Sequence, residues 1–76
     1  MGKKARIVRG KVLARDWDGT IKEEELLLRA GAKGTGKVLH TVQYWPWSSK
    51  SEEAAYTILY EIAQQLGYEI VSGFEE

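Results

Sequence analysis

Cysteine is absent from the 76 residues of this chain, and proline and histidine occur once each. Without cysteine there is neither a disulfide framework nor a thiolate metal site, so the fold must depend on an apolar core. The longest uninterrupted apolar runs are no longer than Leu26–Leu28. This length excludes a transmembrane helix and a membrane partner. No secretion-type leader pattern is evident, so a cytoplasmic location is the default expectation.

The length predicts a single domain over residues 1–76. A domain of this size buries only about 60–65% of the surface that its extended chain exposes, so a deep catalytic cleft is unexpected. The single histidine, His40, falls within a predicted strand and has no Cys, His or Asp near it in sequence. We therefore predict a protein that is not an enzyme and needs no cofactor or metal.

Charge is segregated along the chain, although Lys and Arg balance Asp and Glu at eleven each. The first fifteen residues hold no acid and six basic residues, which are Lys3, Lys4, Arg6, Arg9, Lys11 and Arg15. Residues 38–76 hold six Glu and one basic residue, Lys50. This pattern indicates either pairing within the chain or a basic face for a polyanion. The sequence pI near 6.6 favours the first alternative.

Pairing within the chain follows if Asp16–Gly19 forms a hairpin loop. An uninterrupted register would then produce three cross-strand pairs: Arg15 with Thr20, Lys11 with Glu24 and Ala14 with Ile21. Strand alternation would separate two faces. One face would hold Val8, Gly10, Val12 and Ala14, and the other would hold Arg9, Lys11, Leu13 and Arg15.

The segment Asp16-Trp-Asp-Gly-Thr20 follows an apolar run and resembles the nucleophile motif of the haloacid dehalogenase phosphotransferases. The resemblance would make Asp16 the nucleophile and Asp18 the proton-transferring group. That family also needs a lysine and a downstream acidic pair on a doubly wound sheet, which one helix cannot build. We therefore predict a hairpin turn at the Asp-Gly step.

The same segment resembles the second half of a calcium-binding EF-hand loop. The residues matching loop positions three, five, six, eight and twelve are Asp16, Asp18, Gly19, Ile21 and Glu25. Position one, normally an Asp ligand, is Ala14. The flanks of such a loop are helical; residues 22–30 have high helix propensity, but the β-formers before the loop favour a strand. A degenerate calcium loop is thus an alternative to the turn.

Residues 31–38 resemble the phosphate-binding P-loop, with Gly31, Gly36 and Lys37 in the matching places. A P-loop continues with Ser or Thr, whose hydroxyl binds Mg²⁺, and then opens a helix. Here Val38 follows the lysine, and the next residues are β-branched and aromatic, which is typical of a strand. We predict a flexible glycine-rich hairpin loop, with a degenerate phosphate loop as the alternative.

Residues 50–66 carry the long helical pattern of the chain. Its apolar stripe consists of Ala55, Ile58, Leu59, Ile62 and Leu66. A capping box of Ser49 with Glu52, or a cap at Ser51, would begin the helix, and Gly67 would end it.

Strands are expected at about 4–15, 20–29, 37–45 and 68–74. The predicted fold class is α+β: a three-stranded antiparallel meander, one amphipathic helix and a C-terminal fourth strand in two layers. The last strand should run parallel to the third, either beside it or against the first strand at the other edge. The sequence leaves both edges open.

The segment Tyr44-Trp45-Pro46-Trp47 places three aromatics around the proline, between the third strand and the helix. Because neighbouring strand residues point to opposite faces, Tyr44 and Trp45 cannot both be core if one sheet face is open, and at least one aromatic should reach solvent. With Trp17 at the tip of the first hairpin, these aromatics form what we call the aromatic set. They predict a partly exposed binding patch, and the alternative is a lid over the helix N-terminus.

Two function classes follow. The first is a non-enzymatic adaptor or inhibitor that binds another protein through the aromatic set, which fits the zero net charge. The alternative is a sheet face that binds single-stranded nucleic acid through Arg9, Lys11 and Arg15, the basic set, together with Trp45. We favour the protein partner, and a homodimer is also compatible with the sequence. A common uncovered face for the basic set and Trp45 would favour nucleic acid.

Overall fold

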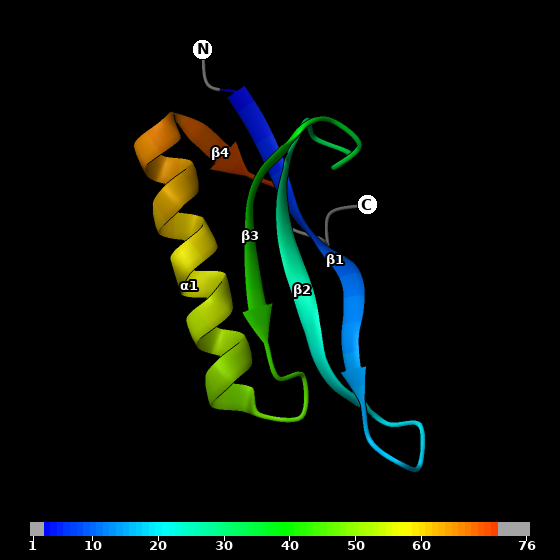
Figure 1. The fold of residues 1–76 in the computed structure, drawn as a ribbon. Helices are drawn as coiled ribbons and strands as arrows, with labels where there is room; N and C mark the ends of the chain where they lie inside the picture. The colour runs from blue at the N-terminus through cyan, green and yellow to red at the C-terminus, as the bar shows by residue number, and fades with distance from the viewer. Residues whose placement is uncertain (1–2, 72–76) are drawn as a thin grey trace.

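The structure of the chain, a computed structural model, describes residues 3–71 and has four strands and one helix in that range. Their bounds are β1 Lys3–Arg15, β2 Ile21–Ala30, β3 Val38–Tyr44, α1 Ser49–Leu66 and β4 Tyr68–Ile70. The helix lies against one face of the sheet, so the predicted α+β fold is confirmed (Figure 1). The fourth strand was predicted to reach residue 74, but it ends at Ile70; residues 72–74 lie outside the described range.

The strands are ordered β3-β2-β1-β4 across the sheet. β4 runs parallel to β1, and therefore to β3, as predicted; it lies at the β1 edge, one of the two positions that the sequence allowed. Gly67, with φ of 84°, ends α1 as predicted and turns the chain into β4. The backbone N–H of Val71 then donates to the carbonyl of Ala5 at 2.8 Å, and Lys4 forms an ion pair with Glu69.

The core fills the space between α1 and the helix-facing side of the sheet. Its buried members are Ala5, Leu26, Leu28, Tyr44, Ala55, Leu59 and Ala63. The predicted helical stripe is correct at its centre, where Ala55 and Leu59 are buried and Ile62 packs against them. Ile58 and Leu66 at its margins are exposed, because the stripe is rotated toward Ala63.

β2 is a strand although residues 22–30 have high helix propensity. Burial along it alternates, with Glu24, Leu26 and Leu28 buried and the residues between them only half-buried. A repeat of two is the side-chain period of a strand. Because β1 and β3 pair with β2 on both sides, its backbone groups are satisfied in the sheet, and this pairing overrides local propensity.

β1 carries a bulge beside Gly10 that changes which side chains face the helix. Arg9 pairs with Leu26 and Val12 pairs with Glu24, so β1 advances three residues where β2 advances two. Such an extra residue interrupts strict alternation. Since Leu26 and Glu24 both lie on the helix-facing side, Arg9 and Val12 lie there as well.

Three predicted pairings in this hairpin are therefore wrong: Arg15 with Thr20, Lys11 with Glu24 and Ala14 with Ile21. The observed pairs are Val12 with Glu24, Ala14 with Glu23 and Arg15 with Ile21. The prediction assumed an uninterrupted register, but the bulge and two further register shifts displace the outer half of β1. The predicted division into two faces fails for the same reason, because Arg9 and Val12 were assigned to opposite faces and share one.

Candidate functional site

Residues 45–47 connect β3 to α1, and hydrogen bonds at the helix start fix their path. The backbone N–H of Trp45 donates to Oγ of Ser51 at 3.0 Å, and the side chain of Ser48 accepts from the backbone N–H of Ser51 at 3.3 Å. Ser48 is therefore the N-cap. The predicted caps at Ser49 and Ser51 are wrong, because the helix begins one residue earlier and the Ser51 hydroxyl reaches back to Trp45.

Trp45 and Trp47 form a stacked pair on this connection. Their ring centroids are 5.6 Å apart with an interplanar angle of 11°. Nε1 of Trp47 donates to the carbonyl of Lys22 in β2 at 3.0 Å. Trp45 is nevertheless 49% exposed and Trp47 is 62% exposed, which confirms that at least one aromatic of this segment reaches solvent. The rings are held in place and presented to water.

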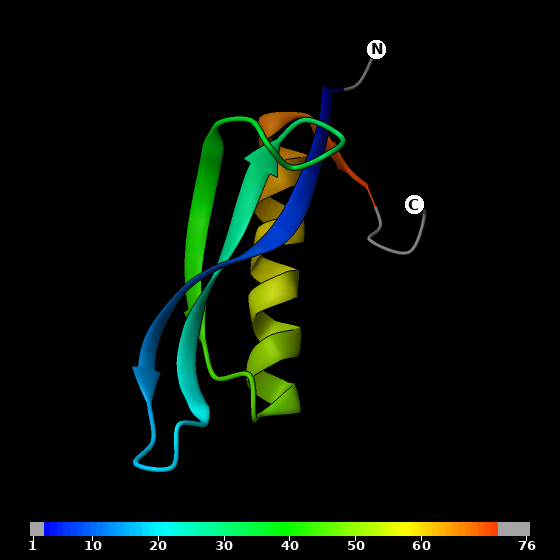
Figure 2. The same ribbon diagram turned by 90° about the vertical axis from the view of Figure 1, so that its right-hand side faces the viewer.

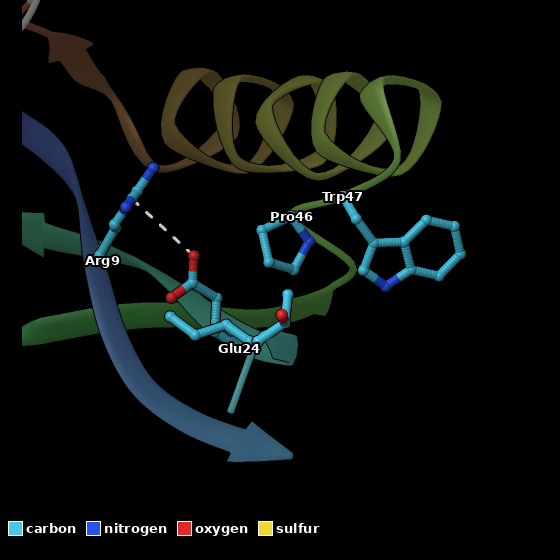
Figure 3. A pocket seen from close by; sticks show the side chains of 6 residues that line it. Arg9, Glu24, Pro46 and Trp47 are labelled. Atoms are coloured by element: carbon cyan, nitrogen blue, oxygen red, sulfur yellow. Dashed lines mark ion pairs between the residues drawn. The ribbon is translucent and has the colours of Figure 1, made fainter. Parts of the chain in front are cut away.

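An open hollow of about 280 Å³ lies beside Trp47 (Figure 3). Pro46 and Trp47 line it from the β3–α1 connection, and the hairpin supplies the remaining lining residues, which are Arg9, Thr20, Ile21 and Glu24. In Figure 3 the side chain of Arg9 extends toward Glu24 across from the two connection residues. The hollow thus combines an apolar wall with a pair of opposite charges.

Glu24 is the buried carboxylate of this site, only 3% exposed. Its Oε1 accepts a hydrogen bond of 2.6 Å from the Tyr44 hydroxyl, and Nε of Arg9 lies 3.8 Å from the same oxygen. Burial, and then the hydrogen bond to Glu24, raise the pKa of Tyr44, so its hydroxyl stays protonated and donates at neutral pH. The acid is therefore fixed from the core side by Tyr44.

The aromatic set is divided by the structure. Tyr44 belongs to the core and presents no surface to a partner. Trp45 and Trp47 are brought together, as described above. Trp17 is 97% exposed at the tip of the β1–β2 hairpin, which lies at the same end of the molecule as the β3–α1 connection (Figures 1 and 2).

The basic set is divided as well. Arg9 lines the hollow beside Trp47. Lys11 stands at the bulge, where its backbone N–H lies 3.4 Å from Oε1 of Glu25. Nη1 of Arg15 donates to the carbonyl of Gly19 at 2.7 Å in the hairpin loop. The three residues do not form one strip, because Arg9 lies on the helix-facing side with Ile7 and the bulge that follows it shifts Lys11 and Arg15 relative to it.

Sequence reasoning missed four lining residues of the hollow: Thr20, Ile21, Glu24 and Pro46. Glu24 lies in a run of three acids and was expected to pair with Lys11. A signal was present, since Glu24 is two and four residues before the buried Leu26 and Leu28 and shares their side of the strand. Thr20 and Ile21 line the hollow because the hairpin lies beside the β3–α1 connection. No local sequence pattern predicts that arrangement.

The segment Asp16–Gly19 is a turn, as predicted. The N–H of Gly19, at φ of 88°, donates to the carbonyl of Asp16 at 2.9 Å. Oδ1 of Asp18 accepts from the backbone N–H of Thr20 at 3.1 Å, and this hydrogen bond lowers the pKa of Asp18. The aspartate thus serves the local backbone, which is its usual role in a turn.

The glycine-rich loop joins β2 to β3, and the strand predicted after Lys37 is confirmed. Figure 2 shows the loop folding back across β1. Nε of Arg6 donates to the carbonyl of Ala32 at 2.8 Å, and Nε of Arg29 donates to the carbonyl of Gly36 at 2.9 Å. Carbonyl oxygens of the loop therefore face cations of the sheet, whereas a phosphate loop turns its N–H groups toward an anion.

Within residues 3–71, no three His, Asp or Glu side chains gather in a way that could hold a metal ion. The one helix of that range is too polar to cross a membrane. Comparison with protein family models, curated proteins and solved structures found no match. Fold and site together define a small α+β domain that presents a stacked indole pair beside an open hollow.

Proposed function

We propose that the chain is a small non-enzymatic binding domain that holds a segment of another protein against Trp45, Trp47 and the adjoining hollow. The observation that carries this proposal is the state of Trp47, whose N–H is bonded to Lys22 while most of its ring faces water. A ring already fixed in place loses little freedom on binding. Trp is also strongly enriched among the residues that dominate binding energy. A cytoplasmic location is part of the proposal.

The test compares the parent with Trp47→Ala and Trp45→Ala in quantitative capture of the native partner. We expect each variant to keep its fold and to lose about 2 kcal/mol of binding free energy or more, roughly thirtyfold in affinity. Tyr60→Ala removes an exposed aromatic from α1 and is the matched control, which should bind like the parent. Variants that fold and retain every partner at parental affinity would overturn the proposal.

Single-stranded nucleic acid is the alternative ligand, and two observations favour a protein. The basic set does not form one strip on the sheet, and Arg15 is bonded to the hairpin loop. Titration with a fluorescent oligothymidine at several salt concentrations separates the two ligands. We expect no binding at physiological salt. Binding with a steep salt slope that is lost in Trp45→Ala would replace the proposed protein partner with nucleic acid.

A further inference from the structure

The two charges of the hollow differ greatly in their access to solvent. The side chain of Arg9 is 70% exposed, whereas that of Glu24 is 4% exposed. A guanidinium carries five N–H donors, and within residues 3–71 the one acid paired with Arg9 is Glu24, through Nε. A molecule that enters the hollow therefore meets the positive charge first. The charge that the hollow presents to solvent is mainly the positive charge of Arg9.

Glu24 and Tyr44 prepare Arg9 to meet an anion. The carboxylate is held at the base by the Tyr44 hydroxyl, and it lies on the Nε side of the guanidinium. A fixed counter-charge behind an exposed arginine favours one orientation of its side chain and leaves the two terminal nitrogens for a ligand. Arginine binds carboxylates through two parallel N–H···O bonds in this geometry.

The opposite wall of the hollow is apolar. Pro46 is half-buried and Trp47 is exposed, and Ile21 of β2 adds an aliphatic side chain. The volume of about 280 Å³ lies at the lower end of the roughly 300–1,000 Å³ that is typical of small-molecule sites. The hollow accordingly has room for one amino-acid residue. One residue that carries both a charged group and an apolar group can therefore occupy it.

We propose that the hollow binds the C-terminal residue of the partner segment, with its free carboxylate on Arg9 and its apolar side chain against Pro46 and Trp47. A C-terminal apolar residue of an unmodified chain carries both groups at once. This inference rests on the proposed function and specifies the chemistry of the bound segment.

The probes are N-acetyl-L-leucine, which has the free carboxylate, and N-acetyl-L-leucinamide, which lacks it. Each is titrated into the ¹⁵N-labelled protein to tens of millimolar while the Nε1–H resonance of Trp47 and the Nε–H resonance of Arg9 are followed by NMR. We expect saturable shifts with the acid and about tenfold weaker binding of the amide, since charge-assisted hydrogen bonds are the strong ones. Equal affinities, or shifts that do not saturate, would overturn the inference.

Arg9→Gln should reduce binding of the acid to the level of the amide. Lys11→Gln is the matched control, because it removes a charge from the same strand outside the hollow. Unchanged binding of the acid by Arg9→Gln would overturn the inference, as would tighter binding of the cationic N-acetyl-L-argininamide. If Arg9→Gln unfolds, the comparison of acid and amide on the parent decides the question.

The two proposals can fail separately. Capture of the protein partner that depends on Trp47 but is unaffected by Arg9→Gln would overturn the C-terminal carboxylate and leave the proposed function in place. Capture that is unaffected by both Trp45→Ala and Trp47→Ala would overturn the proposed function, whatever the small acid does.

Discussion

The hydroxyl of Tyr44 donates a hydrogen bond of 2.6 Å to Oε1 of Glu24, and the two residues face each other across β2 and β3. Both are almost completely buried. Burying a carboxylate is costly unless it is hydrogen-bonded or paired. Tyr44 therefore satisfies the acid at the base of the hollow instead of contributing to the binding surface.

Tyr44→Phe should destabilise the fold by about 1–3 kcal/mol, because it leaves a buried acceptor with one partner fewer. Urea denaturation measures the loss. The control is Tyr60→Phe, which removes the same hydroxyl from an exposed position on α1 and should change stability by less than about 0.5 kcal/mol. Equal effects of the two substitutions would show that the bond to Glu24 contributes nothing.

Alkaline pH should destabilise the folded chain through Tyr44. Its pKa is raised by burial and by Glu24, so the folded state keeps the proton after an unfolded tyrosine, with a pKa of about 10, has lost it. This contribution to stability is complete below pH of about 10 and declines as the pH rises further. Urea titrations on both sides of that pH should show a steeper decline for the parent than for Tyr44→Phe. Parallel declines would contradict the assignment.

Gly36→Ala should be more destabilising than Gly19→Ala. A Cβ at position 36 would lie 2.6 Å from the carbonyl oxygen of Ala30, so the backbone of the loop would have to move. At Gly19 a Cβ meets nothing within 4 Å, and only the positive φ of 88° opposes the substitution. We expect a cost of roughly 1 kcal/mol at position 19 and more at position 36. Thermal unfolding of the two variants checks the order, and the reverse order would refute the packed loop.

Ser48→Ala should cost about 1 kcal/mol of stability, because it removes the oxygen that accepts the N–H of Ser51. Ser49→Ala changes an exposed hydroxyl at the next position and should have little effect. Urea denaturation of both variants distinguishes the observed cap from the predicted one. A larger loss at Ser49 would restore the capping box expected from the sequence.

Most element types and approximate bounds were predictable because they depend on local pattern; β2 is the exception, because its local helix propensity is overridden by pairing with β1 and β3. β-branched and aromatic residues marked β3, the three- and four-residue spacing marked α1, and Gly67 marked its end. The edge occupied by β4 was not predictable, because parallel pairing with β1 or placement beside β3 satisfies the same connection. That choice depends on packing across the whole sheet.

The site was predicted only in part. The position of Trp45 and Trp47 at the end of a strand was enough to predict that they are exposed. The hydrogen bond between Trp47 and Lys22 could not be predicted from the sequence. The orientation of Lys11 and Arg15 relative to Arg9 depends on the bulge beside Gly10. A glycine within a strand is compatible with a bulge, but its position and direction are set by the pairing with β2. For this reason the prediction that Arg9, Lys11 and Arg15 share one face of the sheet was wrong.

The pairing of β4 with the start of β1 also bears on how the chain folds. Lys4 and Glu69 are 65 positions apart, so their strands meet only after a very long loop has closed. Loop closure of this kind is entropically costly, and distant pairings slow folding. During synthesis, the two hairpins of β1, β2 and β3 can form from neighbouring residues. The edge of β1 at Ala5 can pair only after β4 has been synthesised. We expect that edge to be the last part of the sheet to find its partner, and the first place where a nascent chain could pair wrongly with another.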